Sequence, residues 1–183
     1  MLEQMRFSNS SIPVTTVLND INTVAFGGLD LQPSYQRGYV WKDDFKDKLI
    51  YSVIKNYPTG NISVRVLNAP NAKGARSEVV DGQQRLTTLF LLLTYLKDSS
   101  INSNSLSFEA REKSNRTLKY LFDMKRKVEE DPLYSSEIIT GYKVISDYFE
   151  AIDEKEREDF KIKFVEKLKN ILIIRTLAIE VSP

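Results

Sequence analysis

The chain has 183 residues, of which 42% are hydrophobic and 28% charged, so it can bury a core and form a folded domain. Its 26 Lys and Arg residues nearly balance 25 Asp and Glu residues, so any nucleic-acid contact must come from a local basic patch. The absence of Cys and His excludes disulfides, thiolate nucleophiles, Ser-His-Asp triads, HNH-type nuclease chemistry and His-ligated metals. Any chemistry must use carboxylates, Arg, Lys, Tyr, hydroxyls and backbone amides, with or without a hard cation such as Mg²⁺.

Residues 1–100 are predicted to mix short helices and strands, because turn residues interrupt them often. Helices are expected at residues 11–21 and 42–57 and from Gly82 to Leu96, with extended segments at 29–32, 62–67 and 78–80. Pro58 and Gly60 end the second of these helices. These periodicities predict an α/β region. No apolar run reaches the roughly 18 residues needed to span a bilayer, and no basic-then-apolar leader opens the chain, so we expect a cytoplasmic protein without membrane contact.

Residues 101–183 have a different character, since six of the seven glycines precede them. Three charged stretches with apolar stripes predict helices at about 108–130, 135–152 and 154–169. The apolar run at 171–179 predicts a buried strand. The fold class is therefore α+β, with a core at 1–100 and a helical extension at 101–183 that ends in a strand. Because the chain stops directly after that strand, we expect it to be truncated before a further domain.

The segment 79–85, Val-Val-Asp-Gly-Gln-Gln-Arg, is the first candidate for function. A β-branched strand end meets a glycine turn, and a helix follows at once. The unpaired N–H groups and the dipole at a helix start attract anions, and Gly82 lets a phosphate approach the backbone. Arg85 adds a guanidinium that can grip two phosphate oxygens, while Asp81 could bind Mg²⁺ or orient water. The alternative is an ordinary capped turn with Arg85 at the surface.

The second candidate is the segment 33–41, Pro-Ser-Tyr-Gln-Arg-Gly-Tyr-Val-Trp. Its aromatic rings could stack on a base while Arg37 meets a phosphate. The alternative is a hydrophobic plug, in which Tyr39 and Trp41 pack against the helix that follows. We favour Trp41 as a core residue and Arg37 as a functional one.

Together the two segments are more specific than either alone. Tyr-Gln-Arg-x-Tyr-Val-Trp at 35–41 and Asp-Gly-Gln-Gln-Arg-Leu-Thr-Thr-Leu at 81–89 closely resemble the N-terminal domain of GmrSD-type restriction endonucleases, including the SspE-like antiphage family. Residues 12–97 carry this resemblance, and the helical tail is consistent with the family's extension. The resemblance implies a ParB/sulfiredoxin-like mixed-sheet core. In full-length members it also implies a regulatory N-terminal domain and an HNH-type nuclease domain that cuts DNA.

The resemblance further implies that the Asp-Gly-Gln-Gln-Arg loop binds nucleotides and hydrolyses NTP, either GTP or ATP. Arg85 and the amides after Gly82 would hold phosphates. Asp81 would hold Mg²⁺ or polarise the attacking water, and Gln83 or Gln84 would position that water.

The other motif would lie in the same cleft. Gln36 and Arg37 match its signature, so we expect both to bind the nucleotide, with Tyr35 stacking on the base. A DNA-binding module without catalysis is the alternative, and it would use Tyr35, Arg37 and Tyr39 to touch modified DNA. A third possibility is a toxin- or antitoxin-like protein whose helical tail binds a partner. The sequence leaves the oligomeric state open.

This chain departs from the family pattern in two respects. Without His it lacks the HNH nuclease, and it stops before the Phe/Asn-containing motif that usually follows the final strand. We therefore expect no nuclease activity in this chain, and NTP hydrolysis that is weakened or absent even if nucleotide binding survives.

Overall fold

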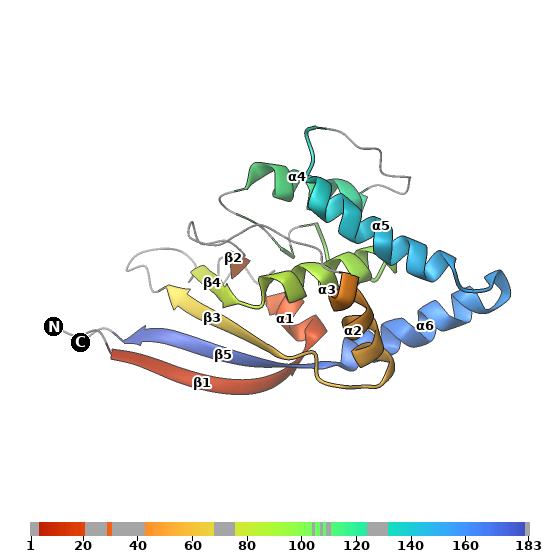
Figure 1. Ribbon diagram of the computed structural model, residues 1–183. Helices are drawn as coiled ribbons and strands as arrows, with labels where there is room; N and C mark the ends of the chain where they lie inside the picture. The colour runs from red at the N-terminus through yellow and green to blue at the C-terminus, as the bar shows by residue number, and fades with distance from the viewer. Residues whose placement is uncertain are drawn as a thin grey trace.

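The computed structural model describes residues 4–20, 29–30, 43–67, 76–103, 105–106, 108, 111–123 and 132–181 (Figure 1). Within these ranges it contains six helices and five strands. The helices are α1 (Val14–Asp20), α2 (Asp43–Ile54), α3 (Gln83–Tyr95), α4 (Glu112–Asp123), α5 (Ser136–Glu150) and α6 (Glu154–Asn170). The strands are β1 (Gln4–Pro13), β2 (Leu29–Asp30), β3 (Asn61–Leu67), β4 (Arg76–Asp81) and β5 (Leu172–Val181). The α+β class predicted from the sequence is confirmed.

The strands form one mixed sheet in the order β1-β5-β3-β4-β2. β5 runs antiparallel to β1, with Phe7 opposite Ala178, and parallel to β3, with Val64 opposite Leu177. β4 pairs antiparallel with β3, and β2 pairs parallel with β4. The last strand therefore lies inside the sheet, between two strands from the first half of the chain.

The helices cover one face of this sheet, with α3 at the centre of the molecule (Figure 1). Residues Leu89 to Leu93 are five consecutive side chains with no exposed surface, so α3 is buried all round rather than along one stripe. α1 contacts α3 on one side, and α4 and α5 contact it on another. On the opposite face of the sheet, the described side chains of Phe7, Leu172 and Ile174 are all exposed.

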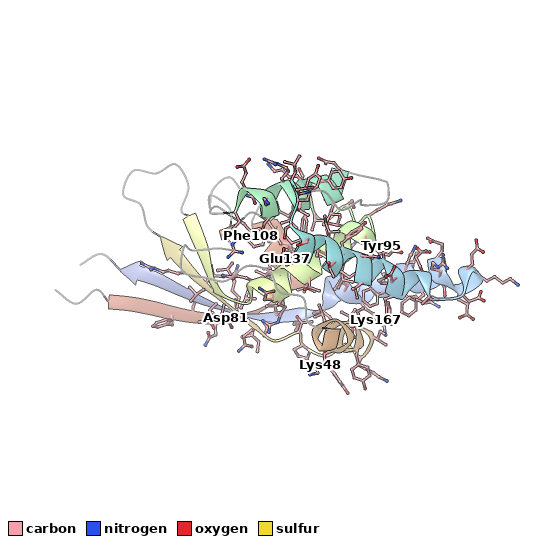
Figure 2. The ribbon with its side chains drawn as sticks, turned by 45° about the horizontal axis from the view of Figure 1, so that its top comes forward. Lys48, Asp81, Tyr95, Phe108, Glu137 and Lys167 are labelled. Atoms are coloured by element: carbon pink, nitrogen blue, oxygen red, sulfur yellow. The ribbon has the colours of Figure 1, made fainter. Side chains whose placement is uncertain are left out.

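Two lysines of α6 bind groups that follow α3 and that end α2. Its Lys169 forms an ion pair of 2.7 Å with the buried carboxylate of Asp98, just after α3. The Nζ of Lys167 donates a 2.7 Å hydrogen bond to the carbonyl of Ile54 at the end of α2, and Figure 2 shows Lys167 beside that helix. The charged face of α6 therefore includes residues that fasten other elements.

Three expectations are corrected. Residues 4–10 form most of β1, although no strand was predicted there, and the helix predicted at 11–21 begins only at Val14. Polar residues dominate this strand, so it forms through backbone pairing with β5 rather than through an apolar pattern. The helix predicted at 108–130 begins at Glu112, because the backbone of Phe108 is held by the side chain of Asn115 in a turn.

The strand predicted at 171–179 is present, but its alternate residues Leu172 and Ile174 are exposed. The division of the chain into 1–100 and 101–183 stays a prediction. The sheet itself draws its strands from both parts, because β5 lies between β1 and β3.

Candidate functional site

The junction between β4 and α3 carries the first predicted motif. β4 ends at Asp81 and α3 begins at Gln83, so Gly82 is the whole connection. Gly82 has φ 99° and ψ 7°, the left-handed region that glycine adopts without strain. A Cβ atom here would lie 2.6 Å from Cγ2 of Ile62 and 3.2 Å from its Cα. Both the backbone angle and the space around it therefore require glycine.

The start of α3 has the features of an anion site. Gly82 has no side chain to cap the helix, and its carbonyl accepts the first intrahelical bond, 2.9 Å from the N–H of Leu86. The N–H groups of the first turn precede that bond and have no partner within the helix. The helix dipole adds partial positive charge at this end. In Figure 2, Asp81 lies where the strands meet this end of α3, opposite the end marked by Tyr95.

The two glutamines of the motif have different surroundings. Gln83 is buried, and its Nε2 donates a 2.9 Å hydrogen bond back to the carbonyl of Val79 in β4. Gln84 is half-buried, and its carbonyl accepts a 2.8 Å bond from the hydroxyl of Thr88. Gln83 thus fastens the helix to the strand, which leaves Gln84 as the more accessible of the two for positioning water.

The Arg85 side chain is half-buried and lies against the backbone of the turn between α2 and β3. Nη1 donates a hydrogen bond to the carbonyl of Asn61, and a Cβ placed on Gly60 would lie 3.1 Å from Nη2 and 3.2 Å from Cζ. Burial lowers the pKa of Arg85, and the negative charge of Asp81 opposes this shift. Arg85 remains a cation, since guanidinium groups keep their proton in proteins. Among the described side chains, no carboxylate forms an ion pair with it.

Sequence reasoning missed Gly60 and Asn61 as neighbours of this site. Gly60 was interpreted only as the end of a helix, although its φ of 97° places it in the left-handed region. Its carbonyl accepts a 3.2 Å bond from the N–H of Ile174, and the N–H of Thr59 donates a 3.4 Å bond to the carbonyl of Leu172. The turn that supports Arg85 is therefore fastened to β5.

The second predicted motif lies outside the described residues. This applies to Tyr35, Gln36, Arg37 and Tyr39, and also to Trp41. Their predicted places in the cleft and in the core therefore remain predictions.

Asp81 is the predicted Mg²⁺ ligand, and its side chain is exposed. In the part of the chain that the structure describes, no three Asp or Glu side chains gather closely enough to hold a metal ion by themselves. Mg²⁺ commonly binds one or two carboxylates together with substrate phosphates and water. A single carboxylate next to an anion site fits that mode of binding, with the phosphates completing the coordination.

No helix within the described ranges is long and apolar enough to cross a membrane.

Comparison with known proteins gives one finding about the family. No curated protein matches the chain. The family model for the N-terminal domain of GmrSD restriction endonucleases matches residues 14–181. This match extends beyond the residues that carry the resemblance in sequence, and it includes the helices α4 to α6 and the interior strand β5. The chain therefore belongs to the family of GmrSD restriction endonuclease N-terminal domains.

Proposed function

We propose that this domain binds and hydrolyses a nucleoside triphosphate and thereby regulates a modification-dependent restriction or antiphage nuclease. The observation that carries the proposal is the Arg85 guanidinium, which extends from the first turn of α3 to the carbonyl of Asn61 and has no carboxylate partner among the described residues. Family membership supports the defence role. We further propose that the mixed sheet and its helices are a ParB/sulfiredoxin-like core.

In this proposal the phosphates lie at the turn formed by Gly82. The N–H groups of the first α3 turn and the guanidinium of Arg85 hold them, since both supply fixed positive charge. Mg²⁺ on Asp81 would neutralise part of the phosphate charge. Gln84 is accessible at the same helix start and would orient the attacking water, and Arg85 stabilises the charge that develops on the transferred group. Gln36, Arg37 and Tyr35 would complete the nucleotide site.

An Arg85→Ala variant tests this assignment. A charge-assisted hydrogen bond contributes about 1.5–3 kcal/mol, so we expect ATP and GTP in the presence of Mg²⁺ to bind about 10- to 150-fold more weakly. Isothermal titration calorimetry measures the affinity, and phosphate release measures turnover. Arg116→Ala is the matched control, because Arg116 lies on α4 at the surface and, among the described residues, forms an ion pair with Glu112 alone. Unchanged binding and turnover in a folded Arg85→Ala protein would contradict the assignment.

The family match favours a second candidate function, in which the domain binds modified DNA without catalysis. DNA binding that depends on phosphate contacts weakens steeply as salt rises, whereas nucleotide hydrolysis requires a cation and releases phosphate. The salt dependence of DNA affinity, measured with and without nucleotide, separates the two functions. A steep salt slope that nucleotide does not change, together with no phosphate release, would favour the DNA-binding module.

A further inference from the structure

The turn between α2 and β3 supports a side chain that lies 24 positions further along the chain. Arg85 Nη1 donates to the carbonyl of Asn61. The rest of the guanidinium lies over the Cα of Gly60, where a Cβ would be 3.1 Å from Nη2, 3.2 Å from Cζ and 3.4 Å from Nε. A Cβ at these distances is tighter than most such contacts in proteins, so a side chain at position 60 would push the guanidinium by a few tenths of an ångström. Glycine at position 60 therefore leaves room for the guanidinium where it lies.

This support restrains the guanidinium in two ways. The Asn61 carbonyl accepts a hydrogen bond from Nη1, and the Gly60 backbone lies close to Nη2, Cζ and Nε. A free arginine side chain has rotamer entropy that binding of a ligand would otherwise remove. Holding the group in place before a ligand arrives reduces that cost.

The turn that supports Arg85 is itself bonded to β5. β5 bonds to Thr59 and to Gly60 through backbone atoms, and Asn61 pairs with Ile174 in the parallel ladder. Thr59 is 9% exposed, so the turn is packed as well as bonded. The surface beneath Arg85 is therefore part of the sheet rather than a free loop.

We propose that Gly60 is a positioning residue, which holds Arg85 in the orientation that grips the nucleotide phosphates. The inference rests on the proposed function, because it assigns a purpose to the orientation of Arg85. Gly60 itself touches no ligand. It acts by leaving room for the guanidinium while its φ of 97° brings the Asn61 carbonyl to Nη1.

A double-mutant cycle tests whether Gly60 acts through Arg85. Gly60→Asn is the main variant, because asparagine tolerates positive φ better than other residues that have a Cβ. Its nucleotide affinity is measured alone and in an Arg85→Lys background, where a single ammonium replaces the planar guanidinium. We expect Gly60→Asn to weaken binding of ATP or GTP with Mg²⁺ by about 2- to 10-fold in the Arg85 protein, which corresponds to one hydrogen bond. It should change affinity little in the Arg85→Lys protein.

Asn56→Ala is the matched control for strain in the same turn. Asn56 has φ 58° and is exposed, so the alanine variant should lose stability but keep wild-type affinity for nucleotide. A loss of affinity in Asn56→Ala as large as in Gly60→Asn would show that any strain in the turn has this effect, and would overturn the positioning role.

The outcomes separate the inference from the function on which it rests. If the wild-type protein binds neither ATP nor GTP, the proposed function fails. If it binds one of them and Gly60→Asn costs the same in both backgrounds, the positioning role fails while the function stands. The ¹⁵N-labelled wild-type protein gives an independent measurement that needs no variant to fold. A restrained Arg85 should show resolved Nη signals, and a freely rotating guanidinium would overturn the inference.

Discussion

Replacing Gly82 by alanine should destabilise the domain strongly, because two costs act at the same atom. Alanine at φ 99° incurs the left-handed penalty of about 1–2 kcal/mol. The new methyl would also lie 2.6 Å from Cγ2 of Ile62, which is fully buried and close to the backbone, so overpacking adds about 1–3 kcal/mol. We expect the free energy of unfolding to fall by about 2–5 kcal/mol, measured by urea denaturation followed by circular dichroism.

Gly60→Ala is the control that separates these two costs. Its φ of 97° gives nearly the same backbone penalty, but the nearest atoms belong to the Arg85 guanidinium and lie 3.1 Å or more from the new methyl, so a shift of a few tenths of an ångström relieves the contact. We therefore expect a loss near the backbone cost alone, about 1–2 kcal/mol. In an Ile62→Leu background, which removes Cγ2, the extra cost of Gly82→Ala should shrink. Equal losses for the two alanine variants, or no change in the Ile62→Leu background, would refute the role assigned to the Ile62 contact.

Three further predictions concern stability. Among the described residues, the buried hydroxyl of Thr94 has no hydrogen-bond partner, whereas the hydroxyl of Thr88 bonds within α3. We therefore expect Thr94→Val to stabilise the protein by about 1 kcal/mol and Thr88→Val not to stabilise it, measured by thermal denaturation. Burial raises the pKa of Asp98, but hydrogen bonds, chiefly from Lys169, outweigh this and lower the pKa below its ordinary 3.8. In acid, the folded state therefore binds fewer protons than the unfolded state. This contribution to stability is present above the pKa of Asp98 in the unfolded state and is lost as pH falls through its pKa in the folded state. In denaturant titrations, the Asp98→Asn variant should therefore lose less stability than the wild-type protein below about pH 4. Burial and a hydrogen bond to an α5 carboxylate raise the pKa of Tyr95 above its ordinary 10.0. Because the unfolded state loses this proton first, the stability of the protein should fall as pH rises beyond about 10, and Tyr95→Phe should reduce that fall.

The elements with strong local signals could be predicted from the sequence. The β4–α3 junction was expected because a β-branched pair, an Asp-Gly turn and a leucine-rich helical pattern follow one another in one short segment. α2 was expected from its periodicity and from the Pro58 and Gly60 that follow it. In each case the residues that determine the structure are neighbours in sequence.

β1 and the surroundings of Arg85 could not be predicted in this way. β1 becomes a strand because its backbone pairs with β5, more than 150 positions away, and its polar side chains give no sign of it. Arg85 meets Gly60 and Asn61 only because β3 and the start of α3 are brought together by the sheet. Either Gln83 or Gln84 was expected to position the attacking water, but nothing in the sequence indicates that the Gln83 amide would bond to the Val79 carbonyl.

The interior position of β5 also affects the order in which this domain can fold during synthesis. β1 is synthesised before β5, yet β5 is its sheet neighbour. Before β5 leaves the exit tunnel, β1 lacks this neighbour, and the turn at Thr59 and Gly60 lacks the backbone bonds that β5 supplies. Such non-local pairing slows folding, so we expect the surroundings of Arg85 to form only after β5 has been synthesised.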